Sequence, residues 1–265
     1  MSESSRRSAP AAGGSRPAPP EAAAVALPAL FIADLHLSED QPDTVAAFLA
    51  FLAGPARSAG SLFILGDLFE YWAGDDDLDA PFNRRIGNAL GALAAHGTAV
   101  YFMTGNRDLL AGTAFADTAG LRLLDDPSRV LLGATPALLS HGDALCTDDL
   151  AYQAYRRQVR DPAWQAGFLA QPLAARKAFI ESLRQQSETA KREKAMTIMD
   201  VNADAIAALL RAHDYPVLIH GHTHRPAQHL HQVDEHTCTR WVLADWHGRA
   251  RWLAFDGTCF VAHGD

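Results

Sequence analysis

From residue 29 onward, short apolar runs alternate with clusters of polar residues. Five runs of four or five apolar residues are each followed by Asp, Asn or His, in ALFIADLH, SLFILGDLF, VYFMTGNRD, PALLSHGD and PVLIHGHTH. Unbroken apolar runs of this length are typical of strands that are buried on both faces. The pattern therefore predicts five buried strands, each with a polar cluster at its carboxyl end.

Two stretches between these strands have the spacing of amphipathic helices, residues 42–53 and residues 81–96. The apolar residues that carry the spacing are Val45, Phe48, Leu49 and Leu52 in the first and Ile86, Leu90 and Leu93 in the second. Strands that alternate with helices indicate an α/β fold. In such folds the connecting loops gather functional groups at the carboxyl ends of the strands, where all five polar clusters lie.

Residues 148–195 interrupt this rhythm, because they show no strand pattern and are predicted to form helices punctuated by Pro162 and Pro172. Residues 151–200 hold nine basic and five acidic residues, in a chain whose net charge is −8. A basic insertion on an acidic body favours a lid over an anionic ligand or a contact with an anionic membrane surface. The alternative is an ordinary pair of solvated helices.

The insertion is also rich in large apolar side chains, namely Tyr152, Tyr155, Trp164, Phe168, Phe179 and Ile180. These side chains are predicted either to form an exposed apolar surface or to make a small core within the insertion. Residues 1–27 are mostly Ser, Ala, Pro and Gly, which predicts a disordered tail. The expected organisation is this tail, a core over residues 28–147 and 196–265, and a helical lid over 148–195. The end of the core, from about residue 238 to 263, is expected to form antiparallel strands with turns at Gly248 and Gly257.

Composition narrows the class of protein. With 265 residues, 48% hydrophobic and 20% charged, the chain is globular. Its negative charge argues against a general nucleic-acid binder, and no obligate protein partner is evident. The cysteines Cys146, Cys238 and Cys259 form no CxxC pair, which disfavours a disulfide framework or a cysteine zinc site and fits a reducing cytoplasm. The longest apolar stretch has 12 residues and contains Pro28, which is too short for a membrane span.

Each polar cluster is a weak signal by itself, but together the five supply seven candidate metal ligands with only nitrogen and oxygen donors. They are Asp34, His36, Asp67, Asn106, His141, His222 and His224. Imidazole and carboxylate sites without thiolate suit divalent ions such as Mn, Fe, Co or Zn. If one Asp bridges two ions, the count gives two four-ligand sites with positions left for water and substrate.

The five motifs resemble those of the calcineurin-like metallophosphoesterase superfamily, which are DxH, GD, GNH(D/E), a later His and GHxH, from about residue 29 to 226. The resemblance implies a β-sandwich flanked by helices in place of a doubly wound sheet. It also implies a bridging water, held by Asp67, as the nucleophile. The first ion would be bound by Asp34, His36, Asp67 and His224, and the second by Asp67, Asn106, His141 and His222.

Arg107 stands where this superfamily usually has His. Arginine does not give up its proton near neutral pH, but it can clamp a phosphate with two hydrogen bonds. Together with LCTDD at 145–149, IMDVN at 198–202 and the helical insertion, the GNRD motif resembles one branch, the UDP-2,3-diacylglucosamine diphosphatases of lipid A biosynthesis. The usual ion of that branch is Mn.

This resemblance implies a set of substrate contacts, namely Asn106, Arg107, Asp149, Ser187, Lys191, Lys194 and His222. Lys191 stands where the branch commonly has Asn, so it offers a longer cation and no amide acceptor. The implied reaction splits the diphosphate of the UDP-linked diacylated glucosamine lipid into UMP and 2,3-diacylglucosamine 1-phosphate. The implied location is peripheral, on the cytoplasmic face of the inner membrane, with the apolar residues of the insertion over the acyl chains.

Two other functions stay open at this stage. A soluble phosphodiesterase or nucleotide phosphatase of the same superfamily would act without acyl chains. A non-enzymatic scaffold is disfavoured, because all seven ligand positions are intact. Among the remaining polar residues, Asp108 and Asp143 are expected to orient the ligands. His220 is expected to be structural, with orientation of a ligand as the alternative.

Overall fold

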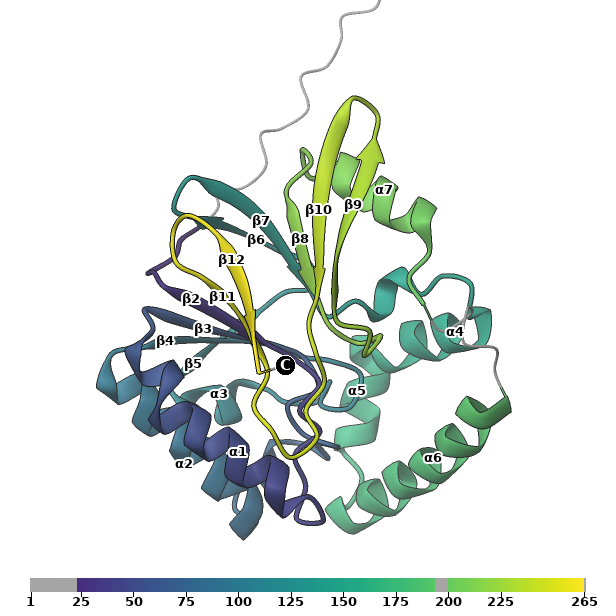
Figure 1. The fold of residues 1–265 in the computed structure, drawn as a ribbon. Helices are drawn as coiled ribbons and strands as arrows, with labels where there is room; N and C mark the ends of the chain where they lie inside the picture. Colours follow the sequence, from purple (N-terminus) through teal and green to yellow (C-terminus); the bar gives the residue numbers. More distant parts are fainter. Residues whose placement is uncertain (1–22, 194–199, 265) are drawn as a thin grey trace, which may run out of the picture.

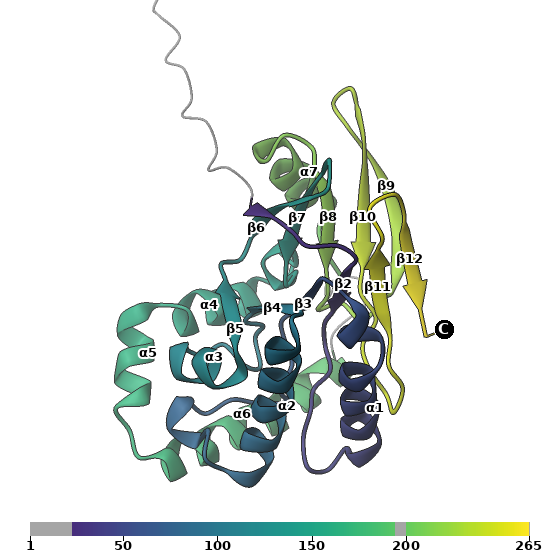
Figure 2. The ribbon, with the colours of Figure 1, turned by 90° about the vertical axis from the view of Figure 1, so that its left-hand side faces the viewer.

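Two six-stranded sheets pack face to face in the computed structural model, which describes residues 23–193 and 200–264 (Figures 1 and 2). The first sheet has the order β12 (Phe260–His263), β11 (Trp252–Phe255), β2 (Ala29–Ile32), β3 (Ser61–Leu65), β4 (Ala99–Met103), β5 (Leu121–Leu124). The second has the order β1 (Ala23–Ala24), β6 (Ser128–Leu132), β7 (Thr135–Ser140), β8 (Val217–His220), β10 (His236–Val242), β9 (Ala227–Val233). The five predicted buried strands are confirmed as β2, β3, β4, β7 and β8.

Alternate residues of each central strand face opposite cores. Phe31 and Phe63, with rings stacked 5.1 Å apart, point between the sheets and meet Leu139 and Ile219 of the second sheet. Their neighbours along the strands point outward to the helices. Because both faces are buried, the apolar runs have no polar interruptions. The result is the layered α/β sandwich implied by the resemblance, and the alternative of one doubly wound sheet is wrong.

Helices cover both outer faces (Figure 1). The first sheet is covered by α1 (Pro42–Ala53), α2 (Pro81–His96) and α3 (Thr113–Ala119), and the second by α7 (Ala203–Ala212). Short 3-10 turns occur at Pro55–Ser58, Asp75–Asp77 and Asp143–Leu145. The predicted bounds of α1 and α2 are confirmed. Each helix begins at a proline and ends just before a glycine. Proline suits a first helical position because its missing N–H has no partner there, and a glycine such as Gly97, with φ of +117°, can end the helix in the left-handed region.

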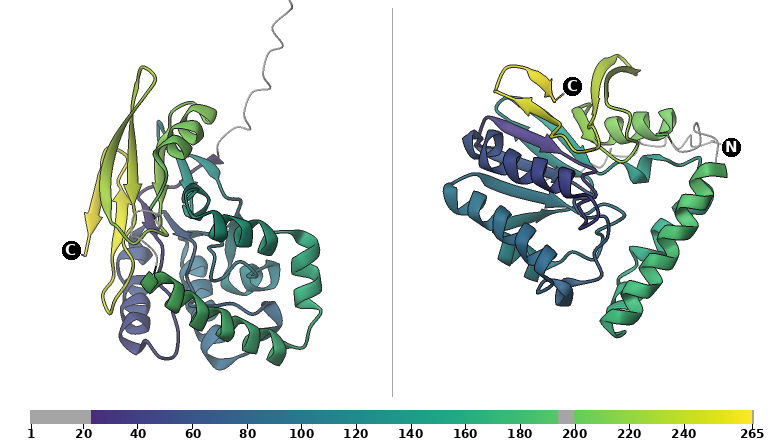
Figure 3. Two further views of the ribbon diagram at one scale, coloured as in Figure 1. Left: turned by 90° about the vertical axis from the view of Figure 1, so that its right-hand side faces the viewer. Right: turned by 60° about the horizontal axis from the view of Figure 1, so that its bottom comes forward.

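The insertion forms α4 (Leu150–Val159), α5 (Pro162–Leu169) and α6 (Leu173–Glu193), and α6 lies as a long arm beside the core (Figure 3). Pro162 opens α5 and Pro172 precedes α6, as the sequence predicted. Both alternatives for the apolar side chains are partly met. Phe168 is buried against the rings of Trp164 and Phe179, while Tyr155 and Phe179 are themselves exposed.

The two ends of the chain differ in part from the sequence predictions. Residues 1–22 of the predicted tail lie outside the described residues, but residues 23–27 are not tail, because β1 pairs with β6 and Val25 and Leu27 pack against the core between the sheets. At the other end, the predicted antiparallel pairing is confirmed for β11 with β12 and for β10 with β9, but β10 is parallel to its other neighbour, β8. The predicted turn at Gly257 joins β11 and β12, whereas Gly248 lies in the connection between the two sheets.

Candidate metal centre

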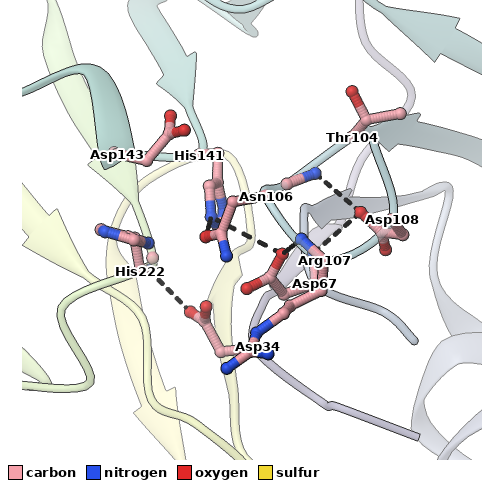
Figure 4. Close-up of polar contacts among 12 residues, drawn as sticks. Asp34, Asp67, Thr104, Asn106, Arg107, Asp108, His141, Asp143 and His222 are labelled. Atoms are coloured by element: carbon pink, nitrogen blue, oxygen red, sulfur yellow. Dashed lines mark hydrogen bonds and ion pairs between the residues drawn. The ribbon is translucent and has the colours of Figure 1, made fainter. Parts of the chain in front are cut away.

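The five polar clusters converge at one end of the sandwich, where β2, β3, β4, β7 and β8 end (Figure 4). Backbone hydrogen bonds link neighbouring loops within each sheet, from the N–H of Asp34 to Gly66 O at 3.1 Å and from the N–H of Gly221 to His141 O at 2.9 Å. Between the sheets, the backbone N–H of His222 donates to Asp34 Oδ2 at 2.8 Å. The two sheets therefore contribute to one group of side chains. We call the seven candidate ligands the metal cluster.

One half of the metal cluster is formed by Asp34, His36 and His224, whose ligand atoms all lie within 4.8 Å of one another. The Nε2 atoms of the two histidines are 3.4 Å apart, and His224 Nε2 is 3.5 Å from Asp34 Oδ1. Asp34 Oδ1 is buried, and within the part of the chain that the structure describes it accepts no hydrogen bond. A buried carboxylate oxygen of this kind is costly unless a cation satisfies it, which fits a metal ligand.

Asp67 connects this half to the second. Its Oδ2 lies 4.0 Å from His36 Nε2, and its Oδ1 lies 3.8 Å from His141 Nε2. His141 Nε2 is also 3.2 Å from Asn106 Oδ1, and the ring of His222 is 5.0 Å from that of His141. One oxygen toward each half is the arrangement that a bridging carboxylate needs. The structure thus brings all seven sequence-predicted ligands together.

The backbone beneath the metal cluster is strained. Among the described residues, five of the eight non-glycine residues with positive φ belong to the metal cluster, namely Asp34, His36, Asp67, His222 and His224, with φ between +51° and +69°. Each such non-glycine residue costs on the order of 1–3 kcal/mol, a cost that folded proteins retain mainly at functional sites. Two motif glycines allow close approach as well. A Cβ on Gly105 would lie 2.1 Å from Asp67 Oδ1, and one on Gly221 would lie 2.3 Å from Asp34 Oδ2.

Asp108 holds two of the loops together, which agrees with its expected orienting role. Its buried carboxylate accepts hydrogen bonds from four backbone N–H groups, those of Asp67, Leu68, Phe69 and Gly105. Burial and the nearby charge of Asp67 raise the pKa of Asp108 to about 6. The loop of Asp67 and the loop of Asn106 are therefore fixed to each other through one side chain.

The electrostatics of the metal cluster favour cations. Burial lowers the pKa of His141, but the carboxylates of Asp67, Asp143 and Asp34 outweigh it and raise the pKa to about 9. In the same way, Asp245 and Asp34 overcome burial and raise the pKa of His224 to about 10. Carboxylates that hold protons on imidazoles also attract divalent ions. The donors and the field therefore both fit such ions.

Two carboxylates that the sequence analysis did not single out contact ligand histidines on the side away from the metal cluster. Glu70 Oε2 is 3.2 Å from His36 Nδ1, and Asp245 Oδ2 is 3.2 Å from His224 Nδ1. Carboxylates in this position fix the ring orientation and the tautomer of metal-binding histidines. The motif GDLFE places Glu70 near Asp67, which was a usable signal, but Asp245 lies in no motif.

The predicted substrate contacts are placed less evenly. Arg107 lies beside Asp67, because its backbone N–H donates to Asp67 Oδ1 at 2.9 Å, and its guanidinium is 3.6 Å from Glu70 Oε1. Asp149 caps α4 by accepting from the N–H of Tyr152 at 3.0 Å. Ser187 and Lys191 lie on α6, where their backbone positions are described, and Lys194 lies outside the described residues.

His220 has the structural role that its position predicted. It is fully buried, and its Nε2 lies 3.0 Å from a guanidinium nitrogen of Arg240 while its Nδ1 lies 2.8 Å from Gly221 O. Burial lowers the pKa of His220 to about 3, so it stays neutral. Asp143, the other expected orienting residue, contacts α4 through Tyr152 and Arg156.

Comparison with known proteins gives consistent matches. The model of the family described as calcineurin-like phosphoesterase matches residues 27–226. A protein named UDP-2,3-diacylglucosamine hydrolase from Aromatoleum aromaticum is 62% identical over 229 residues, which cover 86% of this chain and 93% of the relative. The protein of that name from Chromobacterium violaceum is 50% identical over 228 residues, covering 85% and 94%. Among solved structures, an archaeal phosphodiesterase aligns with a TM-score of 0.43 at 12% identity, covering 90% of this chain and 99% of that one.

Proposed function

The chain belongs to the calcineurin-like phosphoesterase family, and we propose that it hydrolyses the diphosphate of UDP-2,3-diacylglucosamine to UMP and 2,3-diacylglucosamine 1-phosphate. The observation that carries the proposal is the metal cluster with Arg107 beside it, in a chain that is 62% identical to a relative named for this hydrolysis. Intact ligands and a close set of donor atoms support an enzyme over a scaffold.

The family uses divalent metals, and the residues present fit them. We propose two ions, with Mn as the physiological metal, held as the sequence analysis expects, with Asp67 shared. Ions in this position supply a water of lowered pKa and neutralise charge on the phosphoryl oxygens. The chain itself supplies the fixed geometry, because Asp108 and the strained loops hold the donors before substrate arrives.

Arg107 is proposed to clamp a phosphate of the substrate. Its guanidinium is oriented by Glu70, and an arginine can form two parallel hydrogen bonds to phosphate oxygens. Asn106 and His222 both lie beside His141 in the metal cluster, so both can face the reacting phosphate. Ser187, Lys191 and Lys194 are proposed as further contacts from the insertion, and Asp149 as an indirect one, because its carboxylate caps α4.

The insertion is proposed to cover the acyl chains and to contact the cytoplasmic face of the inner membrane. Exposed apolar side chains on its helices, Leu150, Tyr155, Leu169 and Phe179, support this role. Burying each methylene of an acyl chain stabilises a complex by about 0.8 kcal/mol. Within the described residues, no helix is both long enough and apolar enough to cross a bilayer. The association that we propose, carried by these exposed side chains, is interfacial.

The test is UMP release from UDP-2,3-diacylglucosamine with added Mn, compared with a deacylated substrate and with Asp67→Ala. We expect rapid release that is abolished in Asp67→Ala and falls by orders of magnitude without acyl chains. Parallel assays with Mg, Co and Zn test the choice of ion. Equal turnover of the deacylated compound would point to a soluble phosphoesterase. No turnover of either substrate by a metal-loaded protein would contradict the hydrolase itself.

A further inference from the structure

Arg176, at the start of α6, is a buried cation outside the metal cluster. Its side chain is 1% exposed, and its guanidinium donates to the carbonyl of Ala73 and to the carboxylate of Asp76. Its Nε donates to Gln171 O at 3.0 Å. Arginine is almost never fully buried unless it is paired. Here two carbonyls and one carboxylate satisfy it, two of the three from the core loop that follows β3.

The core loop is shaped to receive this side chain. Gly74 has φ of +128°, a conformation that side chains rarely adopt. A Cβ at Gly74 would lie 2.4 Å from a guanidinium nitrogen of Arg176 and 2.8 Å from Leu169 Cδ2. A glycine is therefore required here for two independent reasons, its dihedral angle and the close approach of the insertion. We call Arg176, Ala73 and Asp76 the α6 anchor.

The loop of the α6 anchor is tied directly to the loop of Arg107. The backbone N–H of Trp72 donates to Arg107 O at 3.1 Å, and Trp72 Nε1 donates to Asp75 Oδ1 at 3.0 Å. Asp75 in turn accepts from three backbone N–H groups at the start of α3, those of Gly112, Ala114 and Phe115. The α6 anchor thus rests on a braced loop that also fixes the proposed phosphate clamp.

The α6 anchor lies at the first turn of α6, far along the helix from the proposed substrate contacts. Arg176 lies in the first turn of α6, whereas Ser187 and Lys191 lie eleven and fifteen residues further on. At 1.5 Å per residue these positions are about 16 and 22 Å along the axis. A small tilt at the first turn therefore becomes a displacement of several ångströms where α6 carries the proposed substrate contacts.

We propose that Arg176 is a positioning residue that sets the orientation of α6 relative to Arg107 and so determines the specificity for the large lipid-linked substrate. This inference rests on the proposed function. It implies that the metal cluster and the α6 anchor act separately. On this inference, the metal cluster hydrolyses small phosphodiesters whether or not the α6 anchor is intact. The α6 anchor affects only the binding of a substrate that is long enough to contact both α6 and Arg107.

The experiment compares two substrates in Arg176→Met, with bis(p-nitrophenyl) phosphate as the small one and UDP-2,3-diacylglucosamine as the large one, both with Mn. A misplacement of about 1 Å, even from a change far from the reacting atoms, can cost up to about 100-fold. We expect KM for the large substrate to rise by about that amount, with kcat changed far less. Turnover of the small substrate should stay unchanged. Arg176→Lys, which keeps the charge but loses the planar fork, should give an intermediate KM.

Two further variants isolate the α6 anchor. Gly74→Ala intrudes on the guanidinium from the core side and should reproduce the rise in KM. Lys177→Met is the control, because it removes the neighbouring cation of α6, which pairs with Asp77 at 2.7 Å and is 37% exposed where Arg176 is 1% exposed. We expect its KM to change by less than about threefold.

The outcomes separate this inference from the proposed function. If the wild-type protein releases no UMP from the large substrate, the proposed function fails. If it does, and Arg176→Met has an unchanged KM, the inference is wrong. Equal losses on both substrates, or equal effects of Arg176→Met and Lys177→Met, would also overturn it, because they would indicate a general structural or charge effect. If Arg176→Met does not fold, the same comparison is made with Arg176→Lys and Gly74→Ala.

Discussion

The first and last helices of the insertion are both joined to the core by arginine, but the buried partner differs. At α4, the buried group is an acid of the core, since Asp143 is 0% exposed while Arg156 and Arg160 are 18% and 23% exposed. At α6, the buried group is the arginine itself, since Arg176 is 1% exposed while its acidic partner Asp76 is 57% exposed. The two attachments are therefore inverted.

The α4 attachment lies beside the metal cluster. Asp143 accepts from Arg156 Nε at 2.9 Å and from the hydroxyl of Tyr152 at 3.0 Å, and Arg160 reaches both Asp143 and the carbonyl of Gly105. Burial opposes ionisation of Asp143, yet His141, Arg160 and Arg156 hold its pKa below the ordinary value. We call the side chains of Asp143, Tyr152, Arg156 and Arg160 the α4 anchor. Gly105 precedes Asn106, so Arg160 contacts the loop that carries one of the proposed ligands.

The first and last helices of this basic insertion are therefore attached to the core in different ways, with different expected consequences. Arg156 and Arg160 pair with Asp143, a buried acid whose charge raises the pKa of the proposed ligand His141, whereas the core loop at residues 73–76 accommodates the guanidinium of Arg176 from α6. Substitutions in the α4 anchor should therefore weaken metal binding and lower the free energy of unfolding. Substitutions in the α6 anchor should change only the orientation of α6.

The sharpest test of this difference is Arg156→Met combined with Arg160→Met, which leaves Asp143 buried without a cation from α4. Breaking a buried ion pair from one side typically costs about 3–5 kcal/mol. We expect a loss of this size in the free energy of unfolding, measured by urea denaturation of the metal-free protein. Arg84→Met, which breaks an exposed pair with Asp79, is the control and should cost less than about 1 kcal/mol. A double variant as stable as this control would remove the distinction between the anchors.

A second test asks whether α4 reaches the metal cluster. Arg160 donates to Gly105 O at 3.2 Å, next to the proposed ligand Asn106. Loss of a group that orients a ligand typically weakens metal binding by about 10- to 100-fold. We expect Arg160→Met to lie at the lower end, in titration of the metal-free protein with Mn followed by calorimetry. Arg176→Met should bind Mn as the wild type does. Equal affinities in all three proteins would show that α4 does not support the metal cluster.

The same contrast explains what the sequence could predict. The five strands and the seven proposed ligands were visible because a strand buried on both faces needs an unbroken apolar run, and a ligand at its end lies within a few residues of that run. Local signals of this kind survive in a one-dimensional pattern. The bounds of α1 and α2 were predictable for the same reason, because proline and glycine mark helix ends.

The groups that sequence analysis missed are joined only through tertiary structure. Asp245 lies 21 positions after His224, and Arg176 lies 100 positions after Asp76, so no spacing rule connects them. Strand β9 was missed because its exposed positions make AQHLHQV too polar to show an apolar run. Both anchors belong to this class, since a charged residue on a helix looks like an ordinary solvated face until the core places its partner opposite.

A smaller effect is expected at the hydroxyl of Tyr152, which donates to Asp143 in the α4 anchor. Tyr152→Phe removes one hydrogen bond while Arg156 still pairs with the acid, so we expect a loss of about 1 kcal/mol in urea denaturation. Tyr155→Phe, three residues along the same helix and more exposed, is the matched control and should have no measurable effect. Equal losses in both variants would indicate that the contact with Asp143 is not what matters.

The smallest effect is expected at Asp76. Its carboxylate is mostly exposed, and Arg176 keeps the carbonyls of Ala73 and Gln171, so Asp76→Asn should cost less than about 1 kcal/mol at neutral pH. Hydrogen bonding to Arg176 lowers the pKa of Asp76. A lowered folded-state pKa gives stability that is present above the unfolded value, about 3.9, and is lost as the pH falls through the folded value. The difference between wild type and Asp76→Asn should therefore be constant near neutral pH and should begin to close below about pH 4, in urea midpoints measured from pH 7 down to pH 3.5. A difference of several kcal/mol would make the α6 anchor depend on its acid as the α4 anchor does, and the inversion between the two helices would disappear.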